Sequence, residues 1–108
     1  METKRLRIAV APGDGIGIET TREAVRVLAA LADQRAFDLE LTHLPWGADH
    51  FLATGETVPE GGFERLQRDF DAVLVGAFGD PRVPDNRHAK EILLGMRFRM
   101  DLYVNFRP

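Results

Sequence analysis

Apolar residues recur along the chain at two alternating spacings, which predict alternating strands and helices. Residues 6–12, LRIAVAP, form a short apolar run that ends at Pro-Gly, as a buried strand would. Between 19 and 35, apolar residues recur at i, i+3 and i+7 opposite a charged face, which predicts an amphipathic helix. Residues 37–44, FDLELTHL, alternate apolar and polar side chains, the period-2 pattern of a half-exposed strand.

The alternation continues through the second half of the chain. Residues 45–62 are rich in Gly and Pro and predict a long connection, whereas 63–70, FERLQRDF, predict a short helix with one apolar side. The run AVLVGAF at 72–78 is the most apolar of the chain and predicts a central strand. A loop, a short helix at 89–97 and a last strand at 101–106 are predicted to follow.

The expected fold class is therefore α/β, with a mainly parallel sheet, flanking helices and right-handed crossovers. The sequence ends at NFRP directly after the last predicted strand, and about three short helices are available to cover both faces of a parallel sheet. We therefore expect residues 1–108 to be an incomplete N-terminal part of a longer protein. A complete small domain is the alternative.

Composition narrows the classes of partner. The 108 residues are 44% hydrophobic and 29% charged, as in ordinary globular proteins, and 14 basic against 17 acidic residues give a formal net charge of -3. This balance gives no reason to expect a nucleic acid or an anionic membrane as partner. The absence of cysteine excludes disulfides and thiolate metal sites. No apolar stretch reaches the ~20 residues that cross a bilayer, and a cytoplasmic protein without a signal peptide is expected.

Three glycines within five positions, GDGIG at 13–17, mark the first strand-to-helix junction. The dinucleotide fingerprint G-x-G-x-x-G needs one more residue before the last glycine. The acidic residue expected ~20 positions further on, at the end of a second strand, has no clean counterpart, and a Walker lysine is missing. A flexible turn leading into a helix N-terminus can still place free N–H groups opposite an anion or polar ligand. The alternative is a tight turn whose glycines only supply positive φ angles.

Three blocks in order along the chain carry a family resemblance: APGDGIGIE, VLVGAFGDP and LLGMRFRMDLYVNFRP. Together they resemble the β-decarboxylating dehydrogenases, whose members include isopropylmalate, isocitrate, tartrate and D-malate dehydrogenases. The last block is similar to the family's R-x(9)-R element, a helix and strand that end in Arg-Pro. The resemblance spans residues 6–108. It implies an isopropylmalate dehydrogenase-like fold and the N-terminal segment of an oxidative decarboxylase that acts on a small 2-hydroxy dicarboxylic acid.

The resemblance implies a substrate site in the last block. Arg97 and Arg107 match the arginines that bind the carboxylates of the diacid, and a guanidinium fork suits a carboxylate because it can form two parallel hydrogen bonds. Leu93 and Leu94 fall where isopropylmalate dehydrogenases place the leucine pair that packs on the substrate's isopropyl group. From the residues alone, the arginines could equally be solvated surface charges and the leucines part of a core. Arg99 matches no ligand position and is expected at the surface.

The cofactor implied by the resemblance is NAD. Ile16, with Gly15 beside it, matches a position in the opening loop that contacts the dinucleotide. The loop 76–90, which includes Gly79 and Asp80, would border the nicotinamide. The resemblance therefore places the implied cofactor site on the opening loop and the loop 76–90. It places the implied substrate site in the block that follows the second loop.

One departure from the family pattern leaves the substrate open. Isopropylmalate dehydrogenases carry a glutamate three positions before the leucine pair, where this chain has Lys90. The stretches PWGADHF and DPRVPDNRH look more like the tartrate and D-malate branch. Both a 3-isopropylmalate-like substrate and one of the tartrate or D-malate type are therefore candidates.

The resemblance places the reacting groups outside this chain. In the family a lysine and a tyrosine act as general base and acid, and aspartates hold the Mg²⁺ or Mn²⁺ that polarises substrate oxygens. We therefore predict no catalytic or metal-binding residue here, and we expect His43, His50 and His88 to be surface or hydrogen-bonded residues. The full-length protein is expected to be a homodimer and the isolated segment inactive. A non-catalytic truncated remnant and a small-anion-binding α/β module are the alternatives.

Overall fold

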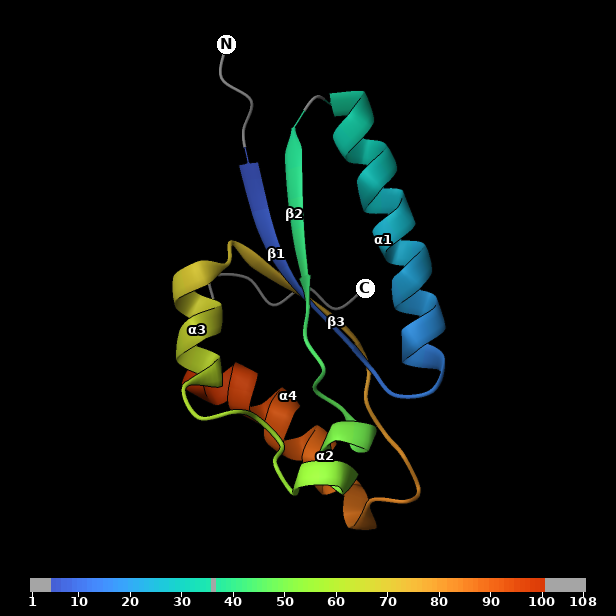
Figure 1. Ribbon diagram of the computed structural model, residues 1–108, viewed down its shortest axis with the longest axis vertical. Coiled ribbons are helices and arrows are strands. Elements are labelled where there is room, and N and C mark those ends of the chain that lie inside the picture. The colour runs from blue at the N-terminus through green and yellow to red at the C-terminus, as the bar shows by residue number, and fades with distance from the viewer. Residues whose placement is uncertain (1–4, 36, 101–108) are drawn as a thin grey trace.

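The computed structural model describes residues 5–35 and 37–100 and shows strands and helices in alternation (Figure 1). In this part of the chain the elements are, in order, β1 Arg5–Gly13, α1 Ile16–Arg35, β2 Asp38–His43, α2 Ala48–Thr54, α3 Gly62–Asp69, β3 Ala72–Ala77, the 3₁₀ turn η1 Pro84–Asn86 and α4 Arg87–Arg99. The α/β class predicted from periodicity is confirmed. The strand predicted at 101–106 lies outside the described residues.

The strands form one parallel sheet in the order β2-β1-β3. Arg5 of β1 lies opposite Asp38 of β2, and Ile8 of β1 lies opposite Ala72 of β3. Parallel neighbours need a crossover connection, and α1 provides it between β1 and β2, whereas α2 and α3 lie between β2 and β3. All three strands therefore end at the same edge of the sheet, where the connecting loops meet.

The prediction that 72–78 forms a central strand is wrong within the described sheet. β1 is central, and its residues 9–11 are completely buried, because it has a strand on each side and helices on both faces. Within this sheet β3 lies at the edge, and its residues are exposed or half-buried. An apolar run indicates that a strand is buried by other parts of the protein. It does not specify the position of that strand in the sheet.

The helices cover the two faces of the sheet with different elements. The main cluster of buried apolar side chains joins the sheet to α3 and α4; its members are Ala9, Ala11, Leu44, Trp46, Phe63, Leu66, Ile92, Met96 and Met100. Val10 points to the opposite face, since successive side chains of a strand alternate, and α1 lies along that face (Figure 1). α4, which carries the predicted substrate residues Leu93, Leu94 and Arg97, is thus anchored in the core through Ile92 and Met96.

The connection predicted over 45–62 contains a helix, α2, that was not predicted from its Gly- and Pro-rich composition. No side chain of its own caps this helix. Instead, the Ala48 N–H donates to Asp14 Oδ1 at 2.6 Å, across 34 positions of sequence. Gly55 ends the helix at φ 75°, with its N–H on the Phe51 carbonyl. A cap supplied from so far away leaves no local signal of a helix N-terminus.

Gly13 ends β1 where β3 approaches, and a Cβ there would overlap the Ala77 carbonyl oxygen. Its φ of 84° also lies in the left-handed region. We expect Gly13→Ala to lower the free energy of unfolding by about 3 kcal/mol or more, because left-handed strain adds to overpacking against backbone. The matched control is Gly55→Ala, since Gly55 has a φ of 75° and nothing within 4 Å; it should cost about 1–2 kcal/mol. Denaturant unfolding compares the two, and equal losses would contradict the packing role of Gly13.

Candidate functional site

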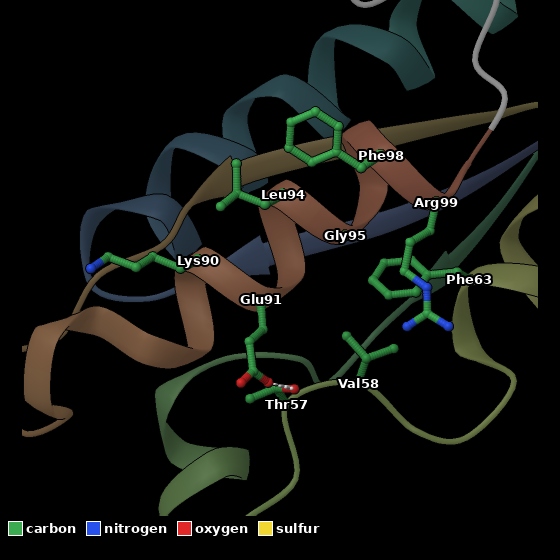
Figure 2. A pocket seen from close by; sticks show the side chains of 9 residues that line it. All are labelled: Thr57, Val58, Phe63, Lys90, Glu91, Leu94, Gly95, Phe98 and Arg99. Atoms are coloured by element: carbon green, nitrogen blue, oxygen red, sulfur yellow. Dashed lines mark hydrogen bonds between the residues drawn. The ribbon is translucent and has the colours of Figure 1, made fainter.

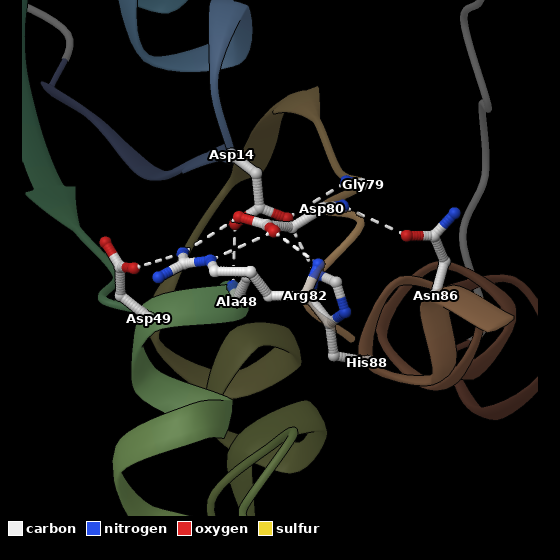
Figure 3. Close-up of polar contacts among 8 residues, drawn as sticks. All are labelled: Asp14, Ala48, Asp49, Gly79, Asp80, Arg82, Asn86 and His88. Atoms are coloured by element: carbon white, nitrogen blue, oxygen red, sulfur yellow. Dashed lines mark hydrogen bonds and ion pairs between the residues drawn. The ribbon is translucent and has the colours of Figure 1, made fainter. Parts of the chain in front are cut away.

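A buried carboxylate, that of Asp14, lies at the edge where the strands end (Figure 3). Its Oδ1 accepts a hydrogen bond from the Ala48 N–H at 2.6 Å. Its Oδ2 accepts from the Gly79 N–H at 2.9 Å and lies 2.6 Å from His88 Nε2. One side chain of the 13–17 loop therefore joins the start of α2, the loop after β3 and the first turn of α4.

The hydrogen bonds keep the Asp14 carboxylate ionised. Burial alone would raise its pKa, but the donors from Ala48, His88 and Gly79 together outweigh burial and hold the pKa below its ordinary value. A buried carboxylate with three donors is stable as a charge because each donor compensates for lost hydration. Asp14 therefore acts as a fixed anionic junction.

The loop between β3 and α4 is held by a second set of polar contacts (Figure 3). The Asn86 Oδ1 accepts from the Asp80 N–H at 2.9 Å. The Arg82 guanidinium donates to Asp80 Oδ2 at 2.8 Å and to Asp49 Oδ1 at 2.6 Å. Through its side chain and its backbone N–H, Arg82 lowers the pKa of Asp80 to about 2. The Asp80 carboxylate is thus already bound by an internal cation.

Replacing Arg82 with methionine is expected to raise the pKa of Asp80 from about 2 toward 3.8, because the guanidinium is the largest cause of the shift. A carboxyl group whose pKa is lowered by folding stabilises the protein at pH values above its pKa in the unfolded chain. This contribution is lost as the pH falls through about 2. An NMR titration of the Asp80 carboxyl carbon measures the change. Arg87→Met is the control, since Arg87 pairs with Glu91 instead. An Asp80 that still titrates near 2 without Arg82 would refute the assignment.

The glycines of the 13–17 loop have two different roles. A Cβ on Gly13 or Gly17 would overlap backbone of Ala77, so these two allow β3 to approach. Gly15 has nothing within 4 Å of a built Cβ, and the neighbouring Ile16 is 72% exposed. Positive φ angles, as in the tight-turn alternative, occur at Gly13 and Gly15 (84° and 54°), whereas Gly17 is needed only for close approach. The middle of the loop is also open for contact with a ligand.

The substrate residues predicted on α4 lie on its outer side. Leu93 and Leu94 are 39% and 44% exposed, and Arg97, one turn after Leu93, is also exposed. The inner side of the helix carries the buried Ile92 and Met96. The leucine pair is therefore not part of the core among the described residues. Arg107 lies outside those residues.

A cavity of about 510 Å³ opens between α4 and the connection that leads to α3 (Figure 2). Its wall is formed by Thr57, Val58, Phe63, Lys90, Glu91, Leu94, Gly95, Phe98 and Arg99. Leu94 places one of the predicted substrate residues on this wall, and Lys90 extends away from the other side chains at one end (Figure 2). The Arg99 guanidinium lies over the Phe63 ring at 5.3 Å, so Arg99 is exposed, as expected, and stacked on an aromatic side chain.

Sequence reasoning did not single out Asp14. The available signal was an acidic residue between two glycines directly after a buried strand, where its carboxylate can meet backbone N–H groups. Its partner His88 is 74 positions away and completely buried. The expectation that His88 is hydrogen-bonded is confirmed at Nε2, whereas Nδ1 has no partner among the described residues.

Residues 5–35 and 37–100 lack two further features. No group of three or more His, Asp or Glu side chains there could hold a metal ion. None of the helices there is long and apolar enough to cross a membrane.

A family profile described as isocitrate/isopropylmalate dehydrogenase matches residues 7–108. Proteins named 3-isopropylmalate dehydrogenase from Thermobifida fusca, Rhodococcus opacus and Streptomyces coelicolor are 43%, 45% and 42% identical to the chain over 108, 103 and 106 residues. These matches cover 100%, 95% and 98% of this chain, but 30%, 29% and 30% of the relatives. The chain therefore spans about 30% of the length of the curated relatives it matches.

Proposed function

Because the chain belongs to the isocitrate/isopropylmalate dehydrogenase family, we propose that it is the N-terminal part of a metal- and NAD-dependent oxidative decarboxylase. Its substrate is a 2-hydroxy dicarboxylic acid of the 3-isopropylmalate type. The observation that carries this proposal is the outer side of α4, where Leu93, Leu94 and Arg97 are exposed together while the inner side anchors the helix in the core. A helix built this way offers an apolar pair and a cation to one small ligand.

In this proposal the arginines bind the diacid and the leucines select its substituent. Arg97 and Arg107 bind the two carboxylates, each through parallel hydrogen bonds from a guanidinium. Leu93 and Leu94 pack against the apolar substituent, and their exposed area supports such a contact. Arg99 does not take part, since its guanidinium lies over Phe63.

NAD binds across the two loops in this proposal. Gly15 and Ile16 supply an open stretch of the 13–17 loop, and Gly79 and Asp80 border the ring. The Asp80 carboxylate is held by Arg82, its N–H by Asn86 and its carbonyl by Val83, so Asp80 contributes to this border by fixing the shape of the loop. When bound, the nicotinamide supplies the hydride acceptor. The Mg²⁺ or Mn²⁺, the acid–base pair and the contacts of a homodimer belong to residues outside those that the structure describes.

A tartrate- or D-malate-type substrate is the second candidate, and Lys90 favours it. Lys90 lies one turn before Leu94 on α4 and lines the same cavity. An ammonium group there suits a polar or acidic substituent better than an isopropyl group. The two candidates therefore differ in which substituent the Lys90–Leu94 end of the site accepts.

Steady-state assays of the full-length protein with NAD and Mg²⁺ test the proposal. We expect NAD reduction with 3-isopropylmalate, D-malate or tartrate, and the preferred diacid identifies the branch. The isolated 1–108 segment is expected to be inactive with all three. A full-length protein that reduces NAD with none of them overturns the proposal, as does an active isolated segment. Calorimetric binding of inorganic phosphate to an inactive full-length protein would favour the small-anion-binding module.

A further inference from the structure

We propose that His88 is a positioning residue, which acts through Asp14 to set the substrate helix α4 against the cofactor loop. The inference rests on the function proposed above. His88 is the second residue of α4, the helix that carries Leu93 and Arg97, and Asp14 directly precedes Gly15. The 2.6 Å contact between His88 Nε2 and Asp14 Oδ2 therefore links the two halves of the site.

The first turn of α4 has no local cap that could replace this contact. Asn86, at the N-cap, makes no capping hydrogen bond with its side chain. Its Oδ1 is used instead by the Asp80 N–H, and its φ of 50° lies in the left-handed region. The start of α4 is therefore oriented by His88 rather than by its own cap.

The Asp14 end of the contact is equally fixed. Its backbone N–H donates to the Ala77 carbonyl at 2.7 Å, and its other carboxylate oxygen is taken by Ala48. The His88 ring is enclosed by Phe51 and Phe78, whose centroids lie 6.1 and 6.5 Å away. Neither side chain can rotate away without breaking other contacts. The hydrogen bond therefore fixes the position of α4 relative to the 13–17 loop.

The geometry also assigns the donor nitrogen of His88. Nε2 lies 2.6 Å from Asp14 Oδ2, and because a carboxylate oxygen can only accept, Nε2 carries the proton of this contact. Long-range ¹H–¹⁵N spectra of the full-length protein measure this proton. An Nε2 without a proton would overturn the assigned contact.

The kinetic test compares two amides in the full-length protein. The amide nitrogen of His88→Gln reaches the place of Nε2, whereas that of His88→Asn ends near Nδ1, too short for Asp14. We expect His88→Asn to lower kcat/KM at least about 10-fold through kcat, because the two ligands are no longer aligned. His88→Gln should stay within about threefold of wild type, and so should the control His50→Asn, because His50 pairs with the exposed Glu56 and not with Asp14.

The outcomes separate this inference from the proposed function. A wild type without activity overturns the proposed function and the positioning role together. An active wild type whose His88→Asn variant keeps its kcat, or whose Gln and Asn variants lose activity equally, overturns the positioning role alone. If His88→Asn does not fold, a folded His88→Gln with less than about one tenth of wild-type kcat/KM overturns it as well.

Discussion

Replacing Asp14 with alanine is expected to lower the free energy of unfolding by about 3–5 kcal/mol, as breaking a buried polar contact set does. Asp14 is 8% exposed, and its carboxylate accepts hydrogen bonds from Ala48, Gly79 and His88. Its loss leaves these three donors without an acceptor in the interior. Denaturant unfolding measures the effect. The control is Asp33→Ala, which removes an exposed aspartate of α1 and should change stability by less than about 0.5 kcal/mol.

The contribution of Asp14 to stability also has a defined pH dependence, which the Asp14→Asn variant reveals. Folding lowers the pKa of Asp14 below 3.8, so its contribution is complete above that value and is lost as the pH falls through the lower, folded pKa. The difference in stability between wild type and Asp14→Asn should therefore be constant near neutral pH and shrink in strong acid. Because both proteins contain the other carboxyl groups, the pH-dependent contributions of those groups cancel in this difference. A constant difference down to the lowest pH, or a loss from Asp14→Ala below about 1 kcal/mol, would contradict the junction role.

Arg97→Met in the full-length protein is expected to lower kcat/KM for the diacid about 100-fold or more. Each charge-assisted hydrogen bond contributes about 1.5–3 kcal/mol, and every 1.4 kcal/mol is a factor of ten in rate. Arg99→Met is the matched control, because Arg99 is also exposed on α4 but lies over Phe63. It should stay within about threefold of wild type. Equal losses in the two variants would show that neither charge is specific for the substrate.

The local pattern of the sequence was enough to predict most elements. Period-2 alternation predicted β2, helical spacing predicted α1, α3 and α4, and apolar runs predicted β1 and β3. These signals are local, since one face of each element is buried against its neighbours. α2 was missed because its cap comes from Asp14. The edge position of β3 within the described sheet was missed because strand order depends on contacts between distant segments.

The candidate site was predictable where it lies on one element. The exposed face of α4 follows from the spacing of Leu93, Leu94 and Arg97 on a helix. The junction between Asp14 and His88 could not be found in this way, because 74 residues separate them and each stands alone in its local pattern. Its formation depends on the parallel sheet, which brings the first and third strand ends together.

The most direct measurement of the central claim is a cycle between Arg97 and the carboxylates of the substrate. Inhibition constants are compared for the diacid and its two monoamides, in wild type and in Arg97→Met. If Arg97 binds one carboxylate, amidation of that group should weaken binding to the wild type strongly and binding to Arg97→Met little. The coupling energy should then be about 1.5 kcal/mol or more. Losses that simply add for both monoamides would show that Arg97 touches neither carboxylate.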